Sequence, residues 1–130
     1  LSGQTIAERI TPPEGYVRTE VATNSFAAYL RQLPLQPEGS KVLLYNGETK
    51  FNQLAAYAVV DLDIGKRDLQ QCADAVIRLR AEYLYGQKQY AAIHFNFTNG
   101  FNAEYTKWAK GNRIRVNGNT VSWYPSKGED

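Results

Sequence analysis

The sequence predicts an α+β fold, and three observations lead to that class. Two stretches, residues 25–33 and 68–85, place apolar residues at helical spacing. Ile93, Phe95 and Phe97 alternate with polar residues, which is the period of a half-buried strand. Helical and extended patterns follow one another without regular strand–helix repeats, so a mixed domain with antiparallel strands is expected.

The composition is that of one soluble domain spanning residues 1–130. With 43% hydrophobic residues, the 130-residue chain can bury roughly two-thirds of the surface that its unfolded form exposes. The net charge of +2 comes from acidic and basic residues mixed along the chain, which predicts no nucleic-acid partner. No apolar run approaches the roughly 20 residues of a membrane helix, so no membrane span is expected. No cofactor is predicted.

The first third of the chain predicts an arm and a helix. Pro12 and Pro13 precede a glycine turn, so residues 1–18 are expected to form an irregular N-terminal arm. Ser25 is a predicted helix cap, and Pro34 ends the amphipathic helix that follows.

Two strands are predicted in the middle of the chain. Residues 41–45 are mostly apolar and run into Asn46-Gly47, a dipeptide typical of a tight turn. Residues 55–60 are compatible with helix or strand, and the alternation that follows favours an extended segment ending at Gly65.

The strongest helix pattern covers residues 68–85. Asp68 is the predicted cap, Gln71 can complete a capping box, and Gly86 lies just past the expected end. One apolar stripe is formed by Leu69, Cys72, Val76, Leu79 and Tyr83.

The C-terminal part predicts a short helix and a hairpin. The helix covers residues 102–110 and ends at Gly111. A two-residue turn within 117–120 would place four apolar side chains on one face of the hairpin. These are Ile114, Val116, Val121 and Trp123.

Cys72, the only cysteine, has two interpretations. Near the start of a helix, the dipole favours a thiolate, as a nucleophile requires. Its place in the apolar stripe favours an inert core residue, because free cysteine is among the most buried residue types. With one cysteine no internal disulfide can form, and cysteine usage indicates no compartment.

His94, the only histidine, is the only conventional base, and Asn96 lies on the same strand face. The order Cys72, His94, Asn96 matches that of cysteine hydrolases, in which the third residue orients the imidazole. The alternative is a hydrogen-bonded histidine without a catalytic role.

Two further groups of residues suggest a metal site and an aromatic binding surface. Asp61 and Asp63 point to one face of a presumed strand, but two carboxylates are too few for a metal site, and none is predicted. Trp108 lies among lysines and arginines in TKWAKGNRIRV. Such aromatic residues can stack on sugar rings, or they can serve only in packing.

A resemblance extends over Gly15 to Trp123. The segments PPEGYVR, SFAAYLRQLPL, VLLYNG, DIGKRDLQQCADAVIRLRAEYLY, IHFNFTNGF and RIRVNGNTVSW, in that order, resemble the first half of an uncharacterised family of exported bacterial proteins, a domain of unknown function. The missing second half of that family contains a histidine strand similar to that of papain-like amidases of the NlpC/P60 and CHAP kinds.

The resemblance implies a papain-like cysteine amidase or peptidase that acts on cell-wall peptides. By this resemblance Cys72 would be the nucleophile, the base would lie beyond this chain, and His94 would be a secondary or structural residue. The residues of this chain alone offer His94 as the base. The resemblance also implies export, and a chain that starts at Leu1 without methionine is consistent with a removed export signal. Two alternatives stay open: a non-catalytic module that binds glycan or peptide, and a structural half-domain that self-associates or docks a missing C-terminal half.

Overall fold

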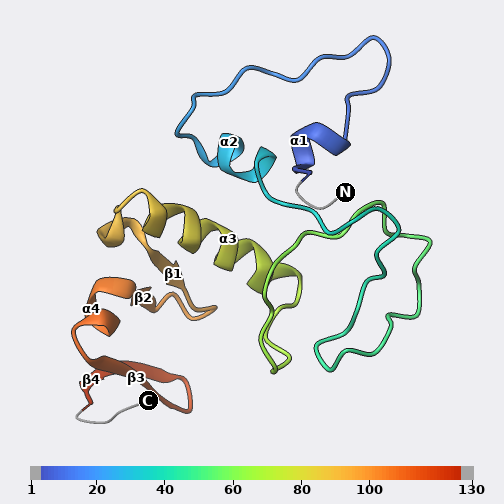
Figure 1. Cartoon of the computed structure of the whole chain (residues 1–130). Coiled ribbons are helices and arrows are strands. Elements are labelled where there is room, and N and C mark those ends of the chain that lie inside the picture. Colours follow the sequence, from blue (N-terminus) through green and yellow to red (C-terminus); the bar gives the residue numbers. More distant parts are fainter. Residues whose placement is uncertain (1–3, 127–130) are drawn as a thin grey trace. The chain divides into compact units, whose positions relative to one another are not determined.

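The computed structural model describes residues 4–126 and shows an α+β protein, as the sequence predicts (Figure 1). The chain divides into two compact units, residues 1–74 and 75–130. The ends of the predicted domain, residues 1–3 and 127–130, lie outside the described residues.

The first unit contains two short helices, α1 (Ile6–Arg9) and α2 (Phe26–Arg31). The Oγ of Ser25 accepts a hydrogen bond from the Ala28 N–H at 3.1 Å, so the predicted cap of α2 is confirmed. Thr5 caps α1 in the same way. Helix α1 lies within the segment predicted to be irregular, and the prolines that suggested an arm affect only the residues after it.

The middle of the first unit is held by isolated bridges instead of strands. The predicted strand over 55–60 is wrong: only Val60 forms a bridge, with Leu35. The turn at Asn46-Gly47 is confirmed, because Gly47 has a φ of 86° and Leu43 bridges Thr49 across it. Residues 55–60 have a preference for strand, but no long partner strand lies beside them in the described part of the chain, so they do not form one.

Helix α3 (Cys72–Gly86) is the longest element. It begins at Cys72, so the predicted cap at Asp68 is wrong. Gln71 precedes the helix, and its N–H donates to Asp74 Oδ2 at 3.3 Å, which is the backward half of a capping box shifted by three residues.

The exposed side of α3 includes part of the predicted apolar stripe. Val76 is 63% exposed, and Leu69, which precedes the helix, is 54% exposed. The buried side chain of α3 is Leu84, at 5% exposure. The shifted helix start removes Leu69 from the stripe.

The second unit adds a short helix and two antiparallel pairs. Residues Tyr90–Ala92 form a 3-10 turn, and strand β1 (His94–Asn96) pairs with β2 (Asn102–Glu104). Helix α4 (Tyr105–Ala109) leads into strands β3 (Asn112–Asn117) and β4 (Thr120–Pro125).

The hairpin β3–β4 has the predicted register. Ile114 is paired with Trp123, and Val116 with Val121, so these four side chains share one face. Gly118 has a φ of 60° and Asn119 is not among the positive-φ residues, which is the pattern of a type II′ turn.

Each unit has a small apolar core. Leu33 and Leu35 are buried in the first unit, and Leu84 and Ile93 in the second. Ile93 immediately precedes β1, the strand that carries His94.

Candidate functional site

Cys72 is the first residue of α3 and its side chain is exposed. The prediction that it belongs to a buried stripe is therefore wrong. The first N–H groups of a helix have no partner within the helix, and they lie at the positive end of its dipole. Helix starts of this kind favour negatively charged groups.

Asp74 modifies this environment. Its carboxylate accepts from the Gln71 N–H, so that amide is already engaged, and the negative charge lies two residues from the thiol. Removing this carboxylate is thus expected to increase the reactivity of Cys72.

His94 is exposed on β1, and its Nδ1 lies 3.1 Å from Asn102 Oδ1. An amide oxygen only accepts, so this contact requires a proton on Nδ1 and leaves the Nε2 lone pair available as a base. Asn102 comes from β2, diagonally across the ladder in which His94 pairs with Glu104. Sequence reasoning missed Asn102, since only the register of β1 and β2 brings it to the imidazole.

Asn96 shares an exposed face of β1 with His94, as predicted, and pairs with Asn102 in the register. Within the described residues, the hydrogen bond to the imidazole comes from Asn102. Cys72 belongs to the first unit and His94 to the second, so the Cys72–His94–Asn96 set remains a prediction.

An aromatic cluster is formed in the second unit by Tyr85, Tyr90, Tyr105 and Trp108. The ring centroids of Tyr85 and Tyr105 are 6.0 Å apart, and those of Tyr105 and Trp108 are 6.1 Å apart. Two pockets of about 370 and 300 Å³ share Tyr85 and Tyr105 in their walls. Thr106 and Lys110 line the second pocket beside the tyrosines, so it combines flat apolar faces with hydrogen-bond donors.

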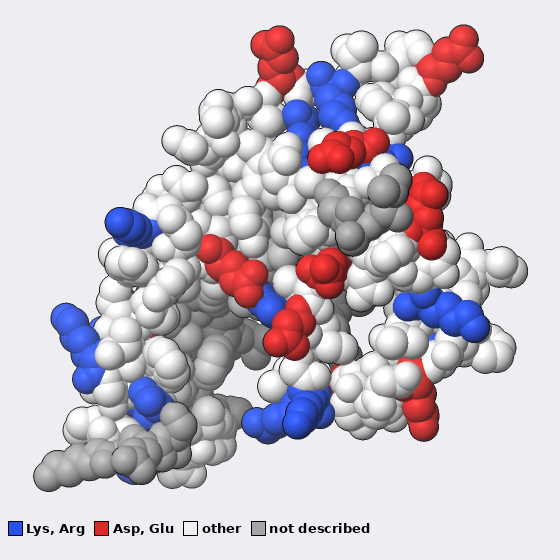
Figure 2. Space-filling view, in the orientation of Figure 1, with Lys and Arg blue, Asp and Glu red and all other residues white. Residues whose placement is uncertain are grey.

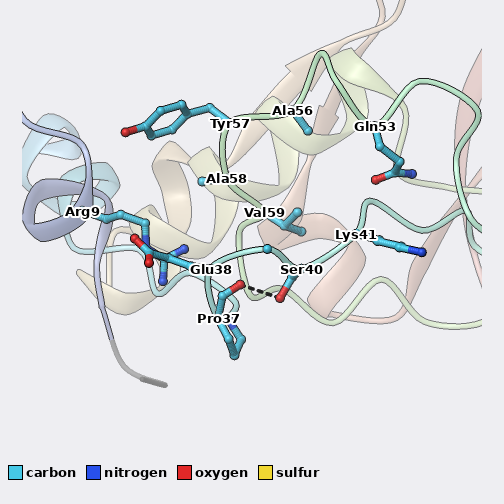
Figure 3. Close-up of a pocket in the computed structure, with 11 residues that line it drawn as sticks. Arg9, Pro37, Glu38, Ser40, Lys41, Gln53, Ala56, Tyr57, Ala58 and Val59 are labelled. Carbon is cyan, nitrogen blue, oxygen red and sulfur yellow. Dashed lines mark hydrogen bonds between the residues drawn. The ribbon is translucent and has the colours of Figure 1, made fainter.

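A larger pocket of about 490 Å³ lies in the first unit (Figure 3). Arg9 lines it and is held by Gln4 and by the carbonyl of Gln36. The Nη2 of Arg9 is buried and has no hydrogen-bond partner among the described residues. Because that atom is closed off, it offers no free donor to a ligand entering the pocket.

Two negative findings apply to the described residues 4–126. No group of three His, Cys, Asp or Glu side chains is placed to hold a metal ion, and this includes Asp61 and Asp63. No helix there is long and apolar enough to cross a membrane.

A comparison with protein families matches residues 6–130 to the domain of unknown function 4846. The chain belongs to this family. Membership confirms the resemblance to an uncharacterised family, while its description assigns no activity. No curated protein and no solved structure shows significant similarity to the chain. Cys72, His94, Asn102 and the aromatic cluster all lie within the part that matches the family.

Proposed function

We propose that this family member is a cysteine amidase or peptidase of exported bacterial type that cleaves amide bonds in cell-wall peptides, with Cys72 as nucleophile. The observation that carries the proposal is the exposed thiol at the first residue of a 15-residue helix. Papain-like amidases, which the sequence resembles, place their cysteine at a helix start in the same way.

The proposed reaction uses the thiol of Cys72 and the free N–H groups at the start of α3. The Cys72 thiolate attacks the carbonyl carbon of the scissile amide, and its proton passes to a histidine. The amine leaves with that proton, and water then hydrolyses the thioester. The Gln71 N–H is bound to Asp74, so the amides of Cys72, Ala73 and Asp74 are the ones left to stabilise the oxyanion.

His94 is the base that this chain itself offers. The Asn102 contact orients the ring, and in the neutral tautomer that donates from Nδ1 to Asn102 the lone pair lies on Nε2. An orienting amide behind a histidine is the arrangement that serves cysteine hydrolases. In the proposed reaction this imidazole accepts the thiol proton at Nε2.

The test is covalent trapping of an acyl-enzyme. Incubation with a synthetic stem-peptide thioester should add the acyl group to Cys72, as located by mass spectrometry of tryptic peptides, and release free thiol continuously. Cys72→Ala should give neither signal, while Cys72→Ser checks that folding is retained. Labelling of the native thiol by iodoacetamide no faster than that of the unfolded chain would rule out an activated nucleophile.

A second candidate function is favoured by the aromatic cluster. Exposed tyrosine and tryptophan rings beside two pockets can stack on sugar rings, with Thr106 and Lys110 as polar contacts. In this function the chain is a glycan-binding module and needs no nucleophile.

Glycan binding is measured by titrating muropeptide fragments against the intrinsic tryptophan fluorescence. Tyr105→Ala should weaken binding about tenfold, since one stacked ring is worth roughly 1 to 3 kcal/mol, while Tyr105→Phe keeps most of it. Tyr16→Ala, an exposed tyrosine of the first unit, is the matched control. Retained binding by Tyr105→Ala would exclude the cluster.

A further inference from the structure

The second unit carries an excess of positive charge. Its described residues 75–126 contain seven lysines and arginines against two glutamates, a formal net charge of +5. Both glutamates are already paired, Glu82 with Arg78 and Glu104 with Lys107. Basic side chains lie over the region that α4, β3 and β4 occupy (Figure 2). The small net charge of the whole chain conceals this asymmetry.

Arg113 and Arg115 project from one face of β3. They are two residues apart on a strand, so both side chains point the same way, separated by about 7 Å. The guanidinium of Arg113 lies 4.8 Å from the ring centroid of Trp108, and that of Arg115 lies 4.5 Å from that of Tyr124. Stacking on rings limits the freedom of both arginines and prepares them to bind carboxylates.

The outer edge of β3 has unused backbone groups. Ser126 N–H donates to Gly111 O at 3.0 Å, so Gly111 and Ser126 form a hydrogen-bonded pair. Hydrogen-bonded and non-hydrogen-bonded pairs alternate in an antiparallel hairpin, and this one pair therefore determines the type of every other pair. Ile114 and Val116 therefore direct their N–H and C=O groups away from β4. Among the described residues no other strand pairs with this edge.

The outer edge of β4 differs from that of β3. Pro125 belongs to a non-hydrogen-bonded pair with Asn112, so its backbone faces away from β3. A proline has no N–H, and pairing with another strand is interrupted at this position. Strand β3 contains no proline. The outer edge of β4 thus lacks a donor at Pro125, whereas every outward position of β3 keeps its N–H, and the edge of β3 lies beside the two arginines.

We propose that β3 binds an extended acidic peptide, which adds to its open edge as a third strand. The peptide residues opposite Ile114 and Val116 lie on the same face of the sheet as these two side chains, and they are apolar. The peptide residues that alternate with them carry carboxylates, which pair with Arg113 and Arg115. The recognised pattern is an alternation of apolar and acidic residues. Antiparallel pairing is expected, since it is the more stable ladder. This surface is independent of the amidase proposal.

The experiment uses fluorescein-labelled Val-Glu-Val-Glu-Val with blocked ends and fluorescence anisotropy on the full chain. N-methylation of the valines removes the N–H groups that would face β3 and should abolish binding. N-methylation of the glutamates places the methyl groups on the far side and should preserve it. Replacement of glutamate by lysine should also abolish binding.

Protein variants give a second test. Arg115→Gln should weaken binding about fivefold, because a charge-assisted pair is lost, and Lys88→Gln removes one charge of the same unit away from the hairpin and should have no effect. Equal affinity for all the peptides, or equally tight binding of oligothymidylate of the same charge, would overturn the proposal and leave only a general electrostatic attraction.

Discussion

Asn102 holds His94 through a side-chain contact of 3.1 Å between Oδ1 and Nδ1, across two strands of only three residues each. The contact exists because the register places Asn96 opposite Asn102 and Glu104 opposite His94. A diagonal neighbour in an antiparallel ladder lies within reach of a long or aromatic side chain. In the neutral imidazole this contact favours the tautomer with the proton on Nδ1.

Nitrogen-15 NMR of the imidazole measures that tautomer directly. We expect the neutral ring to carry its proton on Nδ1, because Asn102 Oδ1 can only accept. Asn102→Leu should shift the population towards the Nε2–H form. Asn96→Leu, on the same exposed face of β1, should leave it unchanged, and a shift in Asn96→Leu alone would assign the orienting role to Asn96.

Asp74 should restrain the reactivity of Cys72. In Asp74→Asn the carboxylate beside the helix start is lost, and iodoacetamide labelling at neutral pH should accelerate about threefold, in line with the 0.3 to 1 kcal/mol typical of one charge near a helix terminus. Asp68→Asn removes a carboxylate that lies before the helix and is the control. Slower labelling in Asp74→Asn would mean that the residue acts mainly by holding the helix start together.

Ser25→Ala should lower the free energy of unfolding of the first unit by about 1 kcal/mol, the usual cost of losing a helix cap. The reason is the bond from Ala28 N–H to Ser25 Oγ. Urea denaturation followed by circular dichroism measures the loss. Thr23→Ala, an exposed position before the cap, should change the midpoint little, and equal effects of both substitutions would argue against a cap.

Two glycines give opposite expectations. Gly118 has a φ of 60° in the β3–β4 turn, so Gly118→Ala should destabilise the hairpin by about 1 kcal/mol. Gly86 is helical and a Cβ there would meet nothing within 4 Å, so Gly86→Ala should stabilise by about 0.5 to 1 kcal/mol. Thermal unfolding separates the two, and a stabilising Gly118→Ala would contradict the turn assignment.

The elements that the sequence predicted well are those with a local signal. Ser25 and the Gly118 turn are confirmed because a cap and a tight turn depend on a few adjacent residues. The start of α3 was placed three residues early, since Asp68 and Asp74 are both acceptable capping partners and local sequence does not choose between them. The segment 55–60 had strand propensity without a partner strand.

The candidate sites divide in the same way. Cys72 and His94 were recognisable as the single cysteine and the single histidine, whereas Asn102 required the register of a hairpin. The open edge of β3 depends on the phase of hydrogen bonding, which follows from Gly111 and Ser126 pairing at the base of the hairpin. Long-range pairing of this kind leaves no trace in composition or periodicity.

Pro125 has a consequence for the behaviour of the protein at high concentration. Growth of a fibre by strand stacking requires two competent edges on every copy, and the missing N–H of Pro125 weakens the edge of β4. Pairing of two copies through β3 would bring Arg113 and Arg115 of one copy against the same residues of the other, and like charges oppose that pairing. The hairpin therefore disfavours pairing with other copies of this protein. The edge of β3 can remain available to a strand of another molecule without promoting aggregation.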